Sequence, residues 1–292
     1  MLPEFLMNLF SPIITGIFLG GLYAVIGLGL SLVFGVMKLV NLAHGAFVVF
    51  GSYLGLALLI AFGLDPILAL ILIVPTAFIL GYCIQKFLVN RAYQLGTEPA
   101  LLITYGISII LANLYQQIFS PYFKSLVTDY SVKGLSIGPY SVPLIYVLDF
   151  IVCFIAMLLL HWLLNKTYIG LSIRCAVQDP VAAKLMGISI EHVYALTLGI
   201  SLSFASLAGV FLGLTFPFNP VSSFTYLFIA FGVVVIGGLG SMTGTFIGGI
   251  VLGLSQTLAA YFLGIGLQTF VGFIVIFIML AIRPQGIFGV KE

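Results

Sequence analysis

Few side chains in this sequence could carry out chemistry. The three cysteines (Cys83, Cys153 and Cys175) lie in apolar or near-loop sequence without paired spacing, which argues against a disulfide framework or a metal site. Asp149 and His161 stand inside one apolar stretch without an evident partner. Ionisable residues in such stretches usually mark proton or ion pathways, but Asp149 is also compatible with an interfacial carboxylate. Because these groups are so scarce, we expect any driving energy to come from elsewhere.

The composition is that of a membrane protein. The chain is 62% hydrophobic and 6% charged, with a mean hydropathy of +1.29, whereas a soluble domain carries about 25% charged residues. From His192 to Ile282 it runs 91 residues without Asp, Glu, Lys or Arg. The net charge of +2 does not indicate nucleic acid, and the sequence has no G-x-x-x-x-G-K-[ST] phosphate loop. We therefore predict one transmembrane domain over residues 1–292, with no catalytic residue, metal or bound cofactor.

Charges, prolines and polar clusters divide the chain into nine apolar segments. A transmembrane helix needs roughly 20 apolar residues, so most of these segments can span a bilayer. The segment at 224–239 is short and is either a full span or a half-entering one. We expect an all-α, polytopic helix bundle with about eight or nine spans. The segments are 10–35, 44–63, 66–86, 98–119, 142–164, 191–215, 224–239, 244–263 and 266–282.

Basic residues decide the expected orientation, because Lys and Arg gather in cytoplasmic loops. With nine crossings and the N-terminus outside, the C-terminus is cytoplasmic and only Lys124 and Lys133 are external. The four segments before the fifth would then run opposite to the four after it, as in an inverted repeat. FGSYLG at 50–55 faintly echoes FGVVVIGG at 231–238. The cytoplasmic basic residues in this orientation are Lys38, Lys86, Arg91, Lys166, Arg174, Lys184, Arg283 and Lys291.

Glycines recur four residues apart, as at Gly16 and Gly20 or Gly51 and Gly55. In lipid this spacing lets two helix backbones approach closely. It predicts tight bundle packing, and surfaces that line a pore would use the same spacing.

Polar residues interrupt the apolar sequence where the first segment ends. Non-helical backbone at membrane depth is tolerated only where it lines a cavity or is buried in protein. Residues 36–44 are therefore either a connection near the cytoplasmic face or a re-entrant piece, and residues 237–244 are either a turn or a half-helix junction. We predict Tyr23, Asn41 and His44 as candidates for a substrate path, although His44 also fits a plain loop histidine.

A polar island at 165–191 separates the two apolar halves. Asp179 followed by Pro180 is a strong helix start, and Gly187 suits the residue after a helix end. The pattern predicts a helix over residues 180–186 that is too short to be stable alone. Its small Ala182–Ala183 surface, with Lys184 and Arg174 as charges, suits docking into a groove of a partner. The alternative is an ordinary linker between the halves.

The sequence resembles a known family, the branched-chain amino acid ABC transporter permeases of the LivH/LivM type. Its N-terminal part is more similar to LivH than to LivM. The resemblance covers nearly the whole chain, and its segments are GLYAVIGLGLSLVFGVMKLVNLAHGAFVVFGSYLG (21–55), GLSIRCAVQDPVAAKLMGI (170–188), GGLGSMTGTFIGGIVLG (237–253) and RPQGIFG (283–289).

The resemblance implies a bacterial inner-membrane subunit that pairs with a second, LivM-like permease. It also implies two cytoplasmic ATPase subunits, which would use the ATP, and a periplasmic or lipid-anchored substrate-binding protein. The longest outer loop, at 120–143, is the expected docking place for that binding protein. The family's ATPase-coupling loop corresponds here to Arg174, Asp179, Pro180, Ala183, Lys184 and Gly187.

Two alternatives remain open on the sequence. One is the same kind of permease with urea or short amides as its cargo, since similar permeases serve those substrates. A stand-alone secondary transporter or channel belongs to a different class, and only the general hydrophobicity of the chain favours it. The scarcity of membrane-embedded acids and the short surface helix both argue against a carrier.

Overall fold

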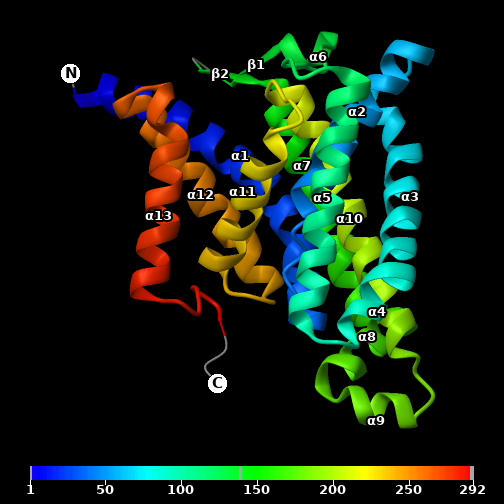
Figure 1. The fold of residues 1–292 in the computed structure, drawn as a ribbon. Helices are drawn as coiled ribbons and strands as arrows, with labels where there is room; N and C mark the ends of the chain where they lie inside the picture. Colours follow the sequence, from blue (N-terminus) through cyan, green and yellow to red (C-terminus); the bar gives the residue numbers. More distant parts are fainter. Residues whose placement is uncertain (1, 138–139, 290–292) are drawn as a thin grey trace.

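The computed structural model describes residues 2–137 and 140–289, and helices dominate it (Figure 1). Eight segments of the described chain are long and apolar enough to span a membrane, which confirms the predicted polytopic helical bundle. The long helices are α1 (Leu2–Met37), α2 (His44–Phe62), α3 (Pro66–Ile84), α5 (Thr97–Phe119), α7 (Leu144–Lys166), α10 (Ile190–Thr215), α11 (Ser222–Gly237), α12 (Met242–Leu263) and α13 (Gln268–Ile282).

The predicted short segment corresponds to α11. At 16 residues and about 1.5 Å of rise per residue, it falls short of the roughly 30 Å of a hydrocarbon core. The smaller elements are a π-helix (Gln85–Val89), α4 (Asn90–Tyr93), α6 (Asp129–Val132), β1 (Gly134–Ile137), β2 (Tyr140–Pro143), α8 (Tyr168–Gln178), α9 (Pro180–Leu185) and a 3₁₀ turn (Ile265–Leu267). The two strands form an antiparallel hairpin.

Along the chain, the long helices form two oppositely directed sets of four, one before and one after α7. The first set is α1, α2, α3 and α5, and the second is α10, α11, α12 and α13. The chain begins at one end of the bundle and finishes at the other, the end from which α8 and α9 project (Figure 1). Two pairs of corresponding helix boundaries are 178 residues apart, namely Met37 and Thr215, and His44 and Ser222. The faint echo noted at Phe50 and Phe231 is therefore three residues out of register.

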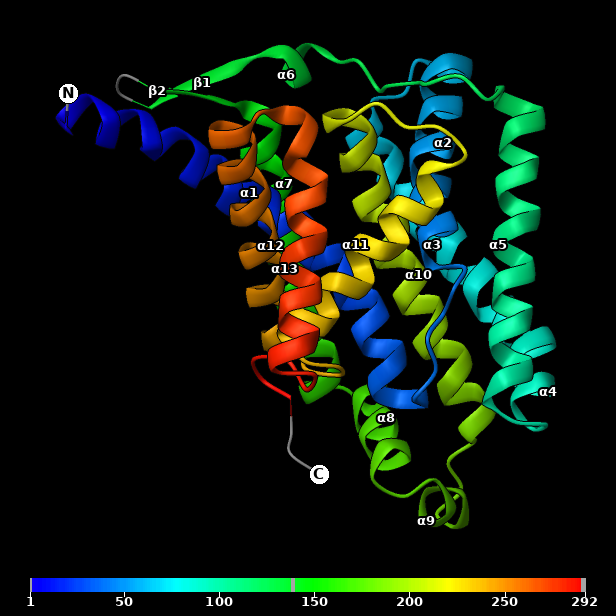
Figure 2. The same ribbon diagram turned by 60° about the vertical axis from the view of Figure 1, so that its left-hand side comes forward.

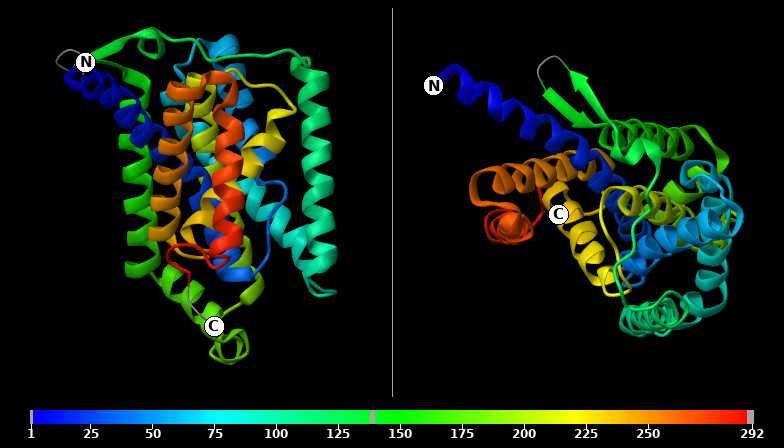
Figure 3. Two further views of the ribbon diagram at one scale, coloured as in Figure 1. Left: turned by 90° about the vertical axis from the view of Figure 1, so that its left-hand side faces the viewer. Right: turned by 90° about the horizontal axis from the view of Figure 1, so that it is seen from above.

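The centre of the bundle is formed by the first helix of each set. α1 and α10 are mostly enclosed by other helices, whereas α5 and α13 are mostly exposed. Seen from above, α1 runs through the middle while α5 and α13 lie at the rim (Figure 3). The two links that reverse direction inside the bundle, at 38–43 and 216–221, each follow one of these central helices.

Glycines bring the helix backbones together as the four-residue spacing predicts. A Cβ atom on Gly253 of α12 would lie 2.5 Å from the carbonyl oxygen of Gly16 in α1, and one on Gly249 would lie 2.6 Å from that of Gly20. These pairs run antiparallel along one seam. A side chain at either position would therefore separate α1 from α12.

We expect Gly253→Leu to destabilise the bundle by roughly 1–3 kcal/mol, the usual cost of overpacking. The matched control is Gly106→Leu in α5, where an added Cβ meets no atom within 4 Å and leucine improves helix propensity. Thermal unfolding of the two purified variants in detergent checks this. Equal midpoints for the two variants would contradict the packing role of the α1–α12 seam.

Candidate translocation path and coupling loop

The chain between α1 and α2 turns back into the bundle. Lys38 adopts a left-handed conformation (φ 53°) directly after α1 ends, and the chain then rises to the start of α2 (Figure 2). The Asn41 side chain accepts a hydrogen bond from the backbone N–H of Ala43 (3.1 Å). Asn41 and His44 are 1% and 0% exposed. Of the two interpretations of residues 36–44, the re-entrant one agrees with the structure.

A second turn of the same kind, at residues 216–221, enters from the opposite end and leads into α11 (Figure 2). Asn219 Oδ1 accepts hydrogen bonds from the backbone N–H and the hydroxyl of Ser222, both at 2.9 Å. Asn219 lies 178 residues after Asn41, the same separation as the helix boundaries. The sequence analysis missed this turn, although the repeated Asn just before an apolar helix is a signal that would have found it.

The two re-entrant turns deliver helix starts that meet each other. A Cβ atom on Gly45, the second residue of α2, would overlap the carbonyl oxygen of Ser223 in α11. The positive ends of two helix dipoles therefore lie close together inside the bundle, and helix N-termini favour negatively charged groups. Backbone polar groups of the two helix starts therefore meet at this crossing.

His44 lies beside this crossing with half of its ring unpartnered. Its Nε2 atom is 2.8 Å from the carbonyl oxygen of Ile26, so the neutral ring donates from Nε2. Nδ1 of His44, Nδ2 of Asn41 and Oγ of Ser201 are buried and have no hydrogen-bond partner among the described residues. Buried polar atoms are normally satisfied, so these three form the main unexplained polar group near the crossing.

Tyr23 does not lie with Asn41 and His44. Its hydroxyl donates to Oε1 of Gln256 across the α1–α12 seam (2.7 Å), and both side chains are buried. Ile26, the contact of His44, lies one turn further along α1. The structure therefore brings Asn41 and His44 together and assigns Tyr23 a contact between helices.

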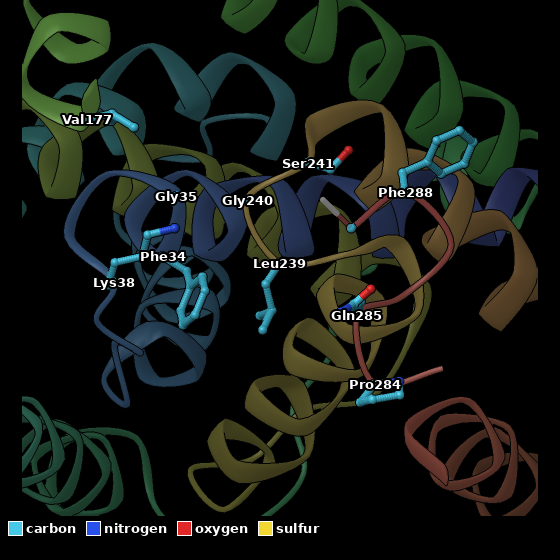
Figure 4. Close-up of a pocket in the computed structure, with 11 residues that line it drawn as sticks. Phe34, Gly35, Lys38, Val177, Leu239, Gly240, Ser241, Pro284, Gln285 and Phe288 are labelled. Carbon is cyan, nitrogen blue, oxygen red and sulfur yellow. The ribbon is translucent and has the colours of Figure 1, made fainter. Parts of the chain in front are cut away.

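A cavity of about 770 Å³ opens at the end of the bundle that carries the C-terminal tail (Figure 4). Gly238 and Gly240 have positive φ values (110° and 82°) in the link between α11 and α12, so residues 237–244 form a turn rather than a half-helix junction. Lys38 supplies a positive charge to the wall. The lining residues are Phe34, Gly35, Lys38, Val177, Leu239, Gly240, Ser241, Pro284, Gln285, Phe288 and Gly289.

Asp149 is enclosed by protein, so its interpretation as an interfacial carboxylate is wrong. The side chain is 0% exposed in the second turn of α7. Its Oδ2 accepts a hydrogen bond from Thr215 (3.0 Å), and Oδ1 has no described partner. His161, by contrast, is exposed on the same helix near Asn165. The two ionisable residues of this segment therefore do not form a relay with each other.

The polar island folds as two helices that project beyond the bundle (Figure 1). Asp179 Oδ1 accepts hydrogen bonds from the N–H groups of Val181 (2.9 Å) and Ala182 (3.0 Å) at the start of α9. Gly187 has a φ of 86° after the helix end, as the sequence predicts. The helix ends at Leu185, one residue earlier than expected.

The outward surface of α9 differs from the predicted one. Ala183 is only 4% exposed and lies against its own loop, so the pair Ala182–Ala183 is not the presented face. Val181, Leu185 and Met186 are instead 70%, 84% and 83% exposed. Arg174 and Lys184 are exposed on the same projection. A capped helix with large apolar side chains in solvent is a typical docking element.

The opposite end of the bundle carries the long loop at 120–143. Lys124 and Phe218 exchange two backbone hydrogen bonds of 2.8 Å, which tie this loop to the second re-entrant turn. Tyr130 donates to Oδ1 of Asp65 (3.2 Å), and burial raises the pKa of the Tyr130 hydroxyl to about 12. The described part of this loop is thus bonded to the bundle at both of these places.

A family model described as the permease component of the branched-chain amino acid transport system matches residues 13–282. The chain belongs to this permease family. The LivH permease protein of Salmonella typhimurium LT2 is 30% identical over 99% of this chain and 96% of its own length. The BraD permease protein of Pseudomonas aeruginosa is also 30% identical, over 100% and 99%. The LivM permease protein of Escherichia coli K12 is 25% identical over 91% and 67%.

The family is one of transport permease components and not a family of enzymes, and the eight candidate spans of the described chain agree with a multi-pass subunit. The matched segment includes both re-entrant turns and the projecting loop. The crossing of α2 and α11 therefore belongs to the part of the chain that the family model describes.

We expect Asn41→Ala and Asn219→Ala each to destabilise the permease by about 1 kcal/mol or more, because each removes side-chain hydrogen bonds that hold a re-entrant turn. Asn113→Ala is the control, because that side chain bonds only a carbonyl of its own exposed helix among the described residues. Protease resistance during heating in detergent measures the difference. The prediction is wrong if the two turn variants behave like the control.

Proposed function

We propose that this permease is one of two membrane subunits of an ABC importer that moves branched-chain and other hydrophobic amino acids across the bacterial inner membrane. The second subunit is a similar, LivM-like permease. Two cytoplasmic ATPases hydrolyse the ATP, and a periplasmic or lipid-anchored binding protein delivers the substrate. The chain itself holds neither ATP nor a cofactor.

The observation that carries this proposal is α9. An isolated helix of two turns is not stable in water, yet this one is capped at both ends and presents Val181, Leu185 and Met186 outward. Such a surface supports docking into a groove of a partner. We assign Arg174, Asp179, Pro180, Ala183, Lys184 and Gly187 to this ATPase-coupling loop, with Ala183 packing the loop internally.

Charge supports the orientation in which the N-terminus is outside. The end of the bundle with α9 also carries Lys38, Lys86 and Arg91, and basic residues gather on the cytoplasmic side. In this orientation the 770 Å³ cavity opens to the cytoplasm. The loop at 120–143 then faces the binding protein, with Lys124 and Lys133 available to acidic groups on it.

Substrate passage in this proposal follows the crossing of α2 and α11. A zwitterionic amino acid needs polar contacts within an apolar bundle, and the two facing helix starts supply N–H groups for its carboxylate. Asn41 and His44 lie at this place, so we retain them as candidates for the path. Tyr23 stays a candidate only through its position on α1.

The test is uptake by vesicles that contain the purified complex of both permeases and both ATPases. We expect ATP-dependent uptake of leucine, isoleucine and valine when the cognate binding protein is added outside. Uptake of urea or short amides in their place would identify the alternative cargo. Uptake by this chain alone, driven by a proton or sodium gradient, would replace the importer with a carrier.

The same vesicles test the outer docking surface. Lys124→Glu with Lys133→Glu reverses both outer charges, and we expect weaker delivery by the binding protein, seen as a higher concentration for half-maximal uptake. Lys124→Arg with Lys133→Arg is the matched control. Unchanged uptake by the charge-reversed variant would move the docking site elsewhere.

A second prediction concerns the coupling loop. Asp179→Ala removes the cap of α9, and Gly187→Val places a β-branched residue at a φ of 86°. Together these changes cost the loop about 2 kcal/mol or more, so substrate moved per ATP should fall by roughly tenfold while the bundle still inserts. Glu98→Ala, an exposed change at the same end of the bundle, is the control. Normal coupling in the double variant would remove the coupling role of α9.

A further inference from the structure

A set of buried side chains connects the coupling loop to the first re-entrant turn. It is centred on the π-helix at Gln85–Val89 and on α4, which together continue α3. Short π-helical stretches occur frequently at functional sites. At this end of the bundle α4 lies beside the start of α10, above the projecting α9 (Figures 1 and 2).

α9 does not pack directly onto this region. A cavity of about 500 Å³ lies between them, with Pro180, Val181 and Lys184 on one wall and Asn90, Tyr93 and Gln94 on the other. The cavity leaves α9 room to move relative to α4. A direct route for a push from α9 is the chain that follows it, which enters α10 at Ile190.

Glu191 joins that chain to α4 through hydrogen bonds. Its carboxylate accepts a hydrogen bond from Gln94 (3.1 Å), and its backbone carbonyl accepts one from the Asn90 side chain (3.1 Å). The other half of the Asn90 amide accepts from Gln85 (2.9 Å). Gln85 and Asn90 are 0% and 5% exposed. Because both ends of the Asn90 amide are used in a buried place, its position is fixed relative to Glu191.

Tyr93 joins the same set of side chains to the end of α1. Its hydroxyl donates to the backbone carbonyl of Met37 (2.8 Å), the last residue of α1. Carbonyls at a helix end lack partners within the helix, so this bond closes α1. The next residue is Lys38 in its left-handed conformation, where the turn to His44 begins. The Tyr93 ring also packs edge-on against Tyr194 of α10, with centroids 5.5 Å apart.

We propose that Asn90 and Tyr93 are positioning residues that transmit displacement of the coupling loop to the re-entrant turn at 38–43. The route runs from α9 through Glu191 to Asn90, along α4 to Tyr93, and from its hydroxyl to Met37. Coupling between distant sites is carried by such chains of packed and hydrogen-bonded side chains. The inference rests on the proposed function, because it assumes that a partner moves α9.

The test is Tyr93→Phe in the full reconstituted complex. This change keeps the ring that packs on Tyr194 and removes only the hydroxyl. We expect ATP hydrolysed per substrate to rise by roughly three- to tenfold, the range that one neutral hydrogen bond allows, with complex assembly and the half-saturating binding-protein concentration unchanged. Tyr82→Phe is the matched control, since its hydroxyl also joins the α3 segment to α10, through His192 (2.8 Å).

A second readout separates transmission from a merely structural role. Lys38→Cys places a thiol on the wall of the 770 Å³ cavity, in a background where the three native cysteines are replaced by alanine. We expect its labelling rate by a polar maleimide to change when a non-hydrolysable ATP analogue is added. Adding Tyr93→Phe should abolish that change and leave the rate without nucleotide as it was.

The outcomes distinguish this inference from the proposed function. Normal coupling in the Asp179 and Gly187 double variant overturns the coupling role of α9 itself. If that double variant uncouples but Tyr93→Phe keeps the normal ATP ratio and the nucleotide-dependent labelling, the link through Tyr93 is overturned. Equal effects of Tyr93→Phe and Tyr82→Phe overturn it too, because Tyr82 bonds His192 rather than the end of α1.

Discussion

Inside a bilayer every backbone N–H and C=O must find its partner within the protein, because no water is available there. This permease reverses its chain twice inside the helix bundle, so the constraint acts most strongly at those two turns. Asn41 satisfies the N–H of Ala43, and Asn219 satisfies that of Ser222. At these turns, side-chain amides thus satisfy the backbone groups that a helix satisfies elsewhere. They let α2 and α11 begin in the interior rather than at a membrane surface.

The position of these two turns also requires glycine where the helices meet. Two helices that start inside a bundle can meet only if their backbones approach closely, and Gly45 provides that approach to Ser223. The same chemistry holds α2 against α10, where the hydroxyls of Ser52 and Ser206 donate to backbone carbonyls of the opposite helix. Small residues therefore serve twice, since they permit close packing and supply the hydrogen bonds that apolar packing cannot.

Much of this architecture follows from the sequence. Apolar length and charge distribution predicted the spans, and the punctuation by Asp179, Pro180 and Gly187 predicted α9 to within one residue. The burial of polar residues was harder to predict from the sequence. Asp149 looked interfacial because it is only the sixth residue of α7, but Thr215 at the neighbouring end of α10 donates a hydrogen bond to it and the side chain is buried. Such a contact depends on how helices distant in sequence pack, and hydropathy carries no information on it.

The two re-entrant turns are equivalent in path but are held by different means. The turn at 216–221 is tied to the loop at 120–143 by main chain: Lys124 and Phe218 exchange two bonds, and Leu126 donates to Gly213 (2.8 Å). Across the bundle, the turn at 38–43 is held through side chains, by Tyr93 at Met37 and by Thr104 at the N–H of Leu42 (3.3 Å). A side-chain bond is exchanged by a rotamer change, whereas a backbone pair separates only when a whole segment moves. The turn at 38–43 is therefore the one held by bonds that a rotamer change can exchange, and the α1 end from which it starts is the end of the bundle where α9 projects.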